Sequence, residues 1–215
     1  MTYSLFDTIR KIVREELGRV RTAELAVVQD QHPHADGGDK DNFACTVALR
    51  DSGIVLKKVP VATQRIGTAS IPAVGELVLV QFVGGDINAP VITGRLYNDE
   101  DRPPVNADQQ AVMHLPLGAA DSDAVHLELQ SGDTRQLLFK LGDALEVTAK
   151  DDDPVIELSV DGGKAKVKIE RDGAVTIESN GNMKFKGGEV KIEGQTIAVE
   201  AQSELKLKGS VVNIN

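Results

Sequence analysis

The sequence predicts a mainly β protein with one short N-terminal helix, a small antiparallel barrel and a C-terminal region of very short strands. Three observations predict this order. Residues 1–20 carry an apolar stripe at helical spacing, residues 21–97 show short alternating runs, and the chain after residue 165 repeats every seven or eight residues. Aromatic residues make up only 3% of the chain, so the core has to be aliphatic, which suits β-structure.

The first element, residues 1–20, has the pattern of an amphipathic helix. Ser4 can cap its start, and Asp7 stands in the first turn, where the helix dipole favours an acid. The apolar stripe consists of Leu5, Phe6, Ile9, Ile12, Val13 and Leu17. A stripe this wide needs a partner surface. That surface is either the chain's own barrel or a neighbouring subunit, and the sequence leaves both open.

Residues 21–104 are expected to form the barrel domain. Short apolar alternations occupy residues 23–28, 43–49, 54–61, 76–82 and 91–96, with turn-forming stretches between them. Five strands with short loops favour a small antiparallel barrel. The charged, Pro-containing segment 99–104 closes this domain. Residues 105–154 then form a connecting region, with two strands expected in it at 125–129 and 137–141.

The C-terminal region, residues 155–215, contains the repeat. Seven apolar pairs follow one another, and in each pair the two residues are separated by one other residue, as in a short strand with one buried face. Charged residues flank the pairs, and glycines fall between them, where the chain has to bend. The expected core residues are Val167, Ile169, Val175, Ile177, Met183, Phe185, Val190, Ile192, Ile197, Val199, Leu205, Leu207, Val212 and Ile214.

Strands this short cannot bury their apolar residues alone, and the sequence offers no second sheet or helix to cover them. Three identical chains wrapped about one axis would bury each pair against its symmetry mates in a triangular prism. A single-chain β-solenoid is the alternative, but such coils usually have repeats of about 20 residues. The pattern therefore favours an intertwined triple-stranded β-helix in a homotrimer.

The net charge argues against nucleic acid as a partner. The formal net charge is −9, with 33 acidic and 24 basic residues. That balance disfavours nucleic acid as a partner, because the phosphates would be repelled and the stacking aromatics are missing.

Cys45 is the only cysteine and stands in an alternating run, so we expect a buried strand residue. The N-terminus lacks the basic and apolar regions of a signal peptide, which predicts synthesis in the cytoplasm without one.

Residues 71–98 carry a specific pattern, P-x-x-G-[DE]-x-V-x-V-x-F, then G-D, then P-V-x-x-G-x-x-[YW]-N. The residues that match it are Pro72, Gly75, Glu76, Val78, Val80, Phe82, Gly85, Asp86, Pro90, Val91, Gly94, Tyr97 and Asn98. The pattern resembles that of the phage baseplate assembly protein V family and of the related VgrG spike proteins of type VI secretion. This resemblance implies an OB-fold barrel followed by a triple-stranded β-helix needle, the order already expected from the periodicity.

The resemblance also implies a function. Such a protein is the trimeric central spike of a phage tail or other contractile injection system. It sits in the baseplate beneath a trimeric hub, and it punctures the target envelope with only transient membrane contact. Its motif residues have structural roles: we expect Gly75, Gly85 and Gly94 to permit turns, and Asp86 and Asn88 to bond the backbone of their own turn.

The chain departs from some relatives at the tip. Family members that close the needle with iron use a His-x-His motif there, whereas the last histidine of this chain is His126. The single His-x-His, residues 32–34, falls in a barrel loop, so we expect no metal and no other cofactor at the tip. A separate PAAR-like tip protein, as on VgrG-type needles, is expected to dock on Val212, Asn213, Ile214 and Asn215.

A spike with cell-wall hydrolase activity is the alternative function. In relatives that carry a lysozyme domain, this domain lies between the barrel and the needle. The connecting region of this chain is too short for such a domain. The carboxylates of Asp151, Asp152 and Asp153 are adjacent in sequence, so they alternate between faces or lie in a turn. No catalytic pair is expected among them, and we therefore expect a protein that is not an enzyme.

Overall fold

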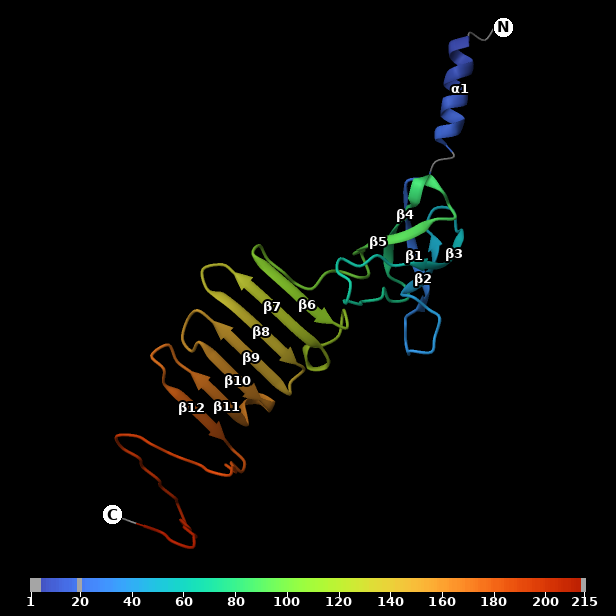
Figure 1. Ribbon diagram of the computed structural model, residues 1–215. Helices are drawn as coiled ribbons and strands as arrows, with labels where there is room; N and C mark the ends of the chain where they lie inside the picture. Colours follow the sequence, from blue (N-terminus) through green and yellow to red (C-terminus); the bar gives the residue numbers. More distant parts are fainter. Residues whose placement is uncertain (1–4, 19–20, 214–215) are drawn as a thin grey trace.

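The computed structural model describes residues 5–18 and 21–213, and it is mainly β with one α-helix, as predicted. The helix, a five-stranded barrel, a seven-stranded sheet and a segment without strands follow one another along an elongated molecule (Figure 1). The expected helix cap Ser4 lies outside the described residues, as do Ile214 and Asn215 of the expected tip.

Helix α1 spans Leu5–Leu17, in agreement with the apolar spacing. Its stripe is uncovered, because Phe6 is 65% exposed and Ile9 is 50% exposed. Figure 1 shows the helix standing clear of the barrel, so packing of the stripe on the chain's own barrel is not observed. Contact with another subunit stays a prediction. No described helix has the length and apolar character needed to cross a bilayer.

Five strands form the barrel, in the order β3-β2-β1-β4-β5. Their bounds are β1 Ala23–His32, β2 Ala44–Leu49, β3 Val55–Pro60, β4 Leu77–Phe82 and β5 Pro90–Leu96, with a 3-10 turn η1 at Val83–Gly85. Neighbouring strands are antiparallel. A parallel bridge between Val61 and Ile92 joins the two ends of the row. The sheet therefore closes into the OB-like barrel that the alternating runs and the family pattern predict.

The barrel core is aliphatic and lies inside the closed sheet. Strand β2 alternates inward and outward, so that Cys45, Val47 and Leu49 are buried. Val78 and Val80 of β4 pack in the same cluster. Burial raises the pKa of the Cys45 thiol, which keeps it protonated and less reactive. Cys45 is thus the buried strand residue that its sequence context predicts.

The second sheet is an antiparallel meander of seven strands in the order β12-β11-β10-β9-β8-β7-β6. The bounds are β6 Gln110–Leu115, β7 Val125–Ser131, β8 Arg135–Leu141, β9 Leu145–Lys150, β10 Ile156–Val160, β11 Ala165–Ile169 and β12 Val175–Ser179, with 3-10 turns η2 Asp121–Asp123 and η3 Asp161–Gly163. The sheet is continuous across residues 154 and 155, where the sequence predicts the boundary between connecting region and needle. The two regions therefore share one sheet.

Tight turns connect most of these strands, and a longer loop, residues 116–124, connects β6 to β7. This loop packs against the turn between β8 and β9, because the amide of Gly142 donates a hydrogen bond to the carbonyl of Ala124 at 2.8 Å. The turn residue Gly142 has φ of 51°. Its lack of a side chain lets the loop approach closely.

Gly142→Ala is expected to destabilise the protein more than Gly162→Ala. Both glycines have left-handed φ angles, 51° and 65°, which cost a residue with a Cβ about 1–2 kcal/mol. A Cβ at Gly142 would also stand 2.2 Å from the carbonyl oxygen of Ser122, whereas a Cβ at Gly162 would meet nothing within 4 Å. Denaturant unfolding should show a further loss of about 1–3 kcal/mol for Gly142→Ala. Equal losses would mean that loop 116–124 does not pack there.

Candidate functional site

One face of the seven-stranded sheet consists almost wholly of apolar side chains, because the cross-strand register places them in rows. The central row contains Met113, Leu127, Phe139, Val147, Leu158, Val167 and Ile177. The two flanking rows on the same face contain Ala, Val, Leu and Ile, with Ser179 as the exception. We call these three rows the apolar face.

The opposite face of the sheet is mainly polar, with Val112 and Leu138 as the exceptions. Its residues alternate in sequence with those of the apolar face, and opposite charges meet across neighbouring strands. The amine of Lys140 lies 3.2 Å from a carboxylate oxygen of Glu146, and that of Lys168 lies 3.7 Å from Glu157. This face suits contact with water, so the sheet is amphipathic.

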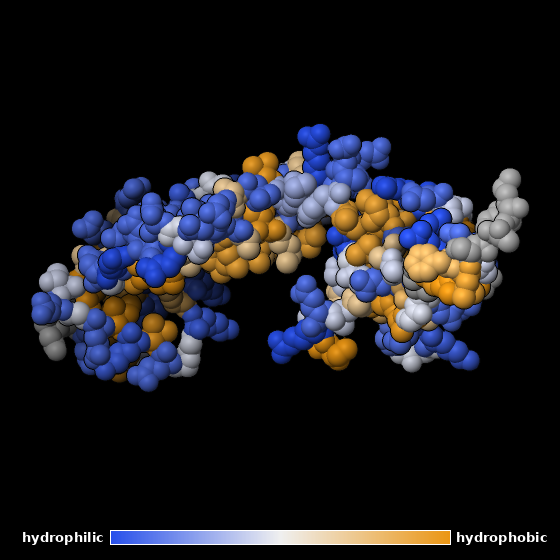
Figure 2. All heavy atoms as spheres, turned by 90° about the horizontal axis from the view of Figure 1, so that it is seen from above, coloured by the Kyte–Doolittle hydropathy of each residue, from blue (hydrophilic) through white to orange (hydrophobic). Residues whose placement is uncertain are grey.

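The apolar face has no cover among the described elements. Met113 is 50% exposed, and Ile177 is 54% exposed. Figure 2 shows hydrophobic side chains gathered along one side of the sheet region and hydrophilic ones along the other. Six strand spacings of about 4.8 Å make this face roughly 30 Å wide. A contiguous apolar surface of that extent is typical of a protein interaction site.

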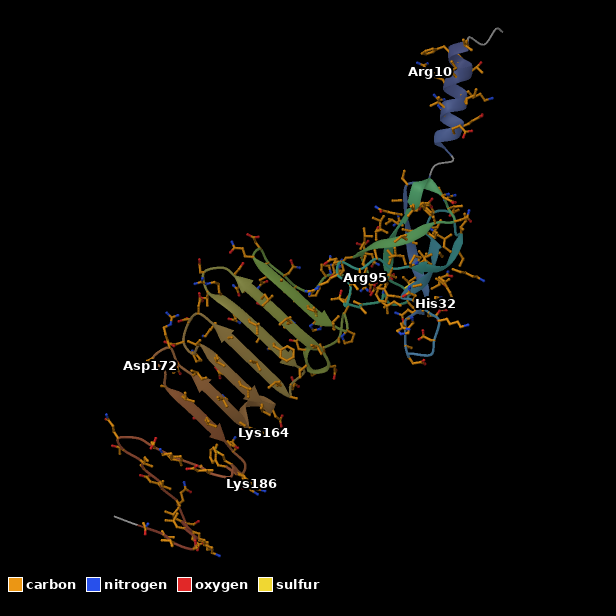
Figure 3. The ribbon with its side chains drawn as sticks, viewed as in Figure 1. Arg10, His32, Arg95, Lys164, Asp172 and Lys186 are labelled. Atoms are coloured by element: carbon orange, nitrogen blue, oxygen red, sulfur yellow. The ribbon has the colours of Figure 1, made fainter. Side chains whose placement is uncertain are left out.

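Residues 181–213 continue the chain as an extended segment without strands or helices. Bends recur at residues 181, 188, 195, 202–203 and 210, which is the seven- to eight-residue period of the sequence repeat. The described structure records no backbone–backbone hydrogen bond for this segment, and the amide of Asn180 makes the last one, to Lys164 at 2.8 Å. Figure 3 shows the labelled side chain of Lys186 on this segment, beyond the last strand.

The extended segment exposes both its backbone and its apolar side chains. Phe185 is 73% exposed and Ile192 is 72% exposed. Unpaired N–H and C=O groups in an extended chain are free to pair with another strand. The segment therefore presents hydrogen-bonding groups and apolar side chains for which the described chain has no partner.

The structure divides the predicted core residues into two groups. Val167, Ile169, Val175 and Ile177 lie together on the apolar face. A second group is exposed on the extended segment and is not brought together within the described chain: Met183, Phe185, Val190, Ile192, Ile197, Val199, Leu205, Leu207 and Val212. Asn213 of the expected tip is also exposed.

Sequence reasoning missed the contribution of strands β6 to β9 to this face. The sequence predicts strands at residues 125–129 and 137–141, but the repeat begins only near residue 165 and so does not assign their inward residues to the same surface. The signal was present, because Leu137, Phe139 and Leu141 alternate with other residues, as do Leu145 and Val147. The apolar face is therefore larger than the repeat alone predicts.

The family-pattern residues lie in and around strands β4 and β5 of the barrel. Gly75 and Gly85 have φ angles of 96° and 78°, in agreement with the turns expected at these positions. Gly94 is different, because it lies within β5 opposite Leu79 and beside a register shift. The expectation of a turn at Gly94 is wrong: its place next to a β-bulge explains the glycine instead.

Other pattern residues hold loops through hydrogen bonds. The carboxylate of Asp86 accepts bonds from the amide of Asn88 at 2.9 Å and from its side chain at 3.0 Å, as expected. The carbonyl of Pro72 accepts a bond from the Gln31 side chain at 2.6 Å. Figure 3 shows Arg95 at the end of the barrel that faces the sheet. These contacts are structural, and none of them pairs a nucleophile with a base.

The acidic run 151–153 holds two turns together. Arg135 donates to both carboxylate oxygens of Asp151, from its amide at 2.8 Å and from Nε at 2.5 Å. The amide of Arg171 donates to Asp153 at 2.6 Å. These carboxylates do not face one another across a cleft. Their contacts agree with the turn expected from the sequence.

The two histidines of the His-x-His sequence point to different partners. A ring nitrogen of His32 lies 2.9 Å from the hydroxyl of Thr46, and a ring nitrogen of His34 lies 2.9 Å from a carboxylate oxygen of Asp39. In the part of the chain that the structure describes, no group of three or more His, Cys, Asp or Glu residues is arranged to hold a metal ion.

The barrel region is similar in sequence to domains of type VI secretion and phage-baseplate proteins. Residues 14–97 match the family model of the type VI secretion system/phage-baseplate injector OB domain. Three similar proteins are the type VI secretion system spike proteins VgrG1a, VgrG1b and VgrG1c of Pseudomonas aeruginosa, which are 29%, 30% and 32% identical over 114, 114 and 112 residues. Each match covers 52% of this chain but only 14%, 12% and 12% of the relative.

Asp151→Asn is expected to reduce the acid sensitivity of the sheet. The Arg135 side chain, and then its amide, hold the pKa of Asp151 below the ordinary value of 3.8. Because the folded pKa is the lower one, this contribution is present above about pH 4 and is lost as the pH falls through the folded pKa. The variant should lose stability at neutral pH and show a shallower decline below pH 4 in unfolding experiments.

Asp143→Asn is the matched control for this experiment. Asp143 also lies in a turn of the sheet, but it makes no hydrogen bond or ion pair with any other described residue. Its substitution should leave both the stability at neutral pH and the acid decline close to those of the unmodified protein. Identical profiles for the two variants would contradict a role for the Arg135–Asp151 pair.

Proposed function

We propose that this chain, whose residues 14–97 form an injector OB domain of the phage-baseplate and VgrG-related family, is a structural subunit of the central spike of a contractile injection system. One observation carries the proposal beyond the family match. The domain is followed by an amphipathic sheet with one uncovered face and then by an extended segment without backbone partners. That combination is typical of a chain completed by copies of itself.

The assembly that we propose is a homotrimer. Three copies of the sheet, each turning its apolar face toward a common axis, would form a prism with a dry interior and a charged exterior. The cross-strand pairs Lys140–Glu146 and Lys168–Glu157 would then lie on the outside. A partner with a different apolar surface would cover the face as well, but the shared period of bends and apolar pairs favours identical chains.

Below the sheet, we propose that the three chains intertwine as a triple-stranded β-helix. Each straight piece between two bends is seven or eight residues long and contains one apolar pair. The backbone groups of residues 182–213, which make no backbone–backbone hydrogen bond within the described chain, would bond those of the two other copies. The resulting needle would resist bending, because every side of the prism is tied to its neighbours.

The proposed place of the spike is the baseplate of a virion or injection particle, beneath a trimeric hub and its tube. The exposed apolar stripe of α1 would contact that hub or another copy of the chain. On contraction the needle would cross the target membrane transiently and mechanically. The matched domain is a structural component, and the carboxylates of residues 151–153 are engaged in turns, so we propose no enzymatic activity.

At the C-terminal end we propose a docking platform for a separate tip protein with a PAAR-like fold. Val212 and Asn213 are exposed, and the backbone of this segment has no described partner. Unpaired backbone groups of this kind can accept added strands from another protein. Ile214 and Asn215 complete the proposed platform.

Ile192→Asp should disrupt the assembly, while the neighbouring Lys191→Asp should be mild. In the proposed prism, Ile192 faces the axis, so its replacement would place three unpaired carboxylates in a dry core. Lys191 faces outward in an exposed ion pair with Glu193 at 2.5 Å, and such surface pairs contribute about 0–1 kcal/mol. Native mass spectrometry should show a trimer for the unmodified chain and for Lys191→Asp, but not for Ile192→Asp. A folded monomer of the unmodified chain at micromolar concentration would overturn the trimer, and equal effects would overturn the register.

Deletion of residues 211–215 should abolish capture of the tip protein while the trimer persists. The test is co-purification with a PAAR-motif protein encoded beside this one, with the mass of the spike measured in parallel. Deletion of residues 1–18, at the opposite end, is the control and should leave capture intact. Undiminished capture by the trimer without residues 211–215 would show that the tip protein binds elsewhere.

A further inference from the structure

Two histidines face each other on the polar side of the sheet, and the proposed function does not use them. His114 of β6 and His126 of β7 are direct cross-strand partners. Their Nδ1 atoms are 3.3 Å apart, and their rings meet edge to face with centroids 5.5 Å apart. Both side chains are partly buried. Strands β6 and β7 form the end of the sheet nearest to the barrel (Figure 1).

The partner of His114 determines which of its ring nitrogens carries hydrogen. Nε2 of His114 lies 3.0 Å from the carbonyl oxygen of Ala119. A carbonyl only accepts hydrogen bonds, so Nε2 of His114 has to be the donor. In the neutral ring, Nδ1 of His114 then carries a lone pair, and this lone pair is directed toward His126.

His126 lies beside a carboxylate. Its Nε2 lies 3.7 Å from a carboxylate oxygen of Glu128, and the other oxygen of that carboxylate accepts a hydrogen bond from Gln110 at 3.0 Å. The negative charge favours hydrogen on Nε2 of His126, which leaves its Nδ1 with a lone pair as well. Two lone pairs at 3.3 Å repel each other unless a proton or a metal cation lies between them.

The distance between the two nitrogens fits a metal cation. Zinc binds histidine nitrogen at about 2.0–2.1 Å, so two nitrogens on one tetrahedral ion are about 3.3–3.4 Å apart. Metal-binding histidines usually donate their other N–H to a carbonyl or a carboxylate, and Nε2 of His114 has such a partner in the carbonyl of Ala119 at 3.0 Å. For His126 the nearest carboxylate, that of Glu128, lies 3.7 Å from Nε2, which is an ion-pair distance and not a hydrogen bond. The neighbouring Lys140 is held by Glu146 at 3.2 Å, which offsets its repulsion of a cation.

We propose that His114 and His126 are the two protein ligands of a site for Zn²⁺ or a similar divalent cation that prefers imidazole, with water completing the coordination. The ion would clip β6 to β7. Because β6 is the edge strand of the sheet and pairs on one side only, such a clip would hold the strand that follows the barrel. The site is contained in one chain, so it does not depend on the proposed trimer.

The first test is a Zn²⁺ titration of the full-length chain, made without a histidine tag and stripped with a chelator, followed by isothermal calorimetry. We expect saturable binding of one ion per chain. His126→Gln should abolish it, and Glu128→Gln should weaken it by removing the negative charge that lies 3.7 Å from Nε2 of His126. His34→Gln, in an exposed loop, is the matched control and should bind as the unmodified chain does.

The second test needs no variant and therefore does not depend on how a variant folds. Diethyl pyrocarbonate modifies accessible histidine nitrogens, and mass spectrometry can map the products. Zn²⁺ should protect His114 and His126 but leave His32 and His34 unprotected. Absence of saturable Zn²⁺ binding, unchanged binding by His126→Gln, or equal protection of all four histidines would each overturn the proposal. Failure of the trimer in the mass measurement would leave these outcomes unaffected, so the two proposals are tested separately.

Discussion

Each extended strand of this protein has to satisfy two requirements: its backbone N–H and C=O groups need partners, and its apolar side chains need cover. The barrel meets both within one chain, because the bridge between Val61 and Ile92 closes the sheet around the core. The inner strands of the seven-stranded sheet, β7 to β11, meet only the first requirement, and the edge strands β6 and β12 meet it on one side. Residues 181–213 meet neither within the described chain. The unmet requirements increase toward the C-terminus, and the proposed trimer would satisfy them.

The two faces of the sheet therefore suit different surroundings, one an apolar partner surface and the other water. The apolar face is suited to assembly, because its central row runs without interruption from Met113 to Ile177. The polar face carries paired charges, which favour solvent and discourage sideways association of strands. The same alternation brings His114 and His126 together on the polar face. One periodic pattern thus accounts both for the proposed spike interior and for a separate candidate cation site on its exterior.

The match to the family model covers the barrel but does not extend to the sheet and the extended segment. The matched residues 14–97 include the closed barrel, whose turns depend on left-handed glycines such as Gly75 and Gly85. The sheet and the extended segment lie outside that match. Their interpretation depends on uncovered side chains and unpaired backbone groups, which are properties of the chain itself.

The sequence by itself determined the helix, the strands of the barrel and the period of the C-terminal repeat, because these follow from local spacing of apolar residues and from turn residues. It did not predict that residues 110–179 form one continuous sheet, that Gly94 lies beside a bulge, or that loop 116–124 packs on Gly142. It also did not predict that His114 and His126 face each other across β6 and β7. These features depend on which strands pair and in what register, and only the tertiary structure decides that, because hydrogen bonds between strands join residues that are distant in the sequence.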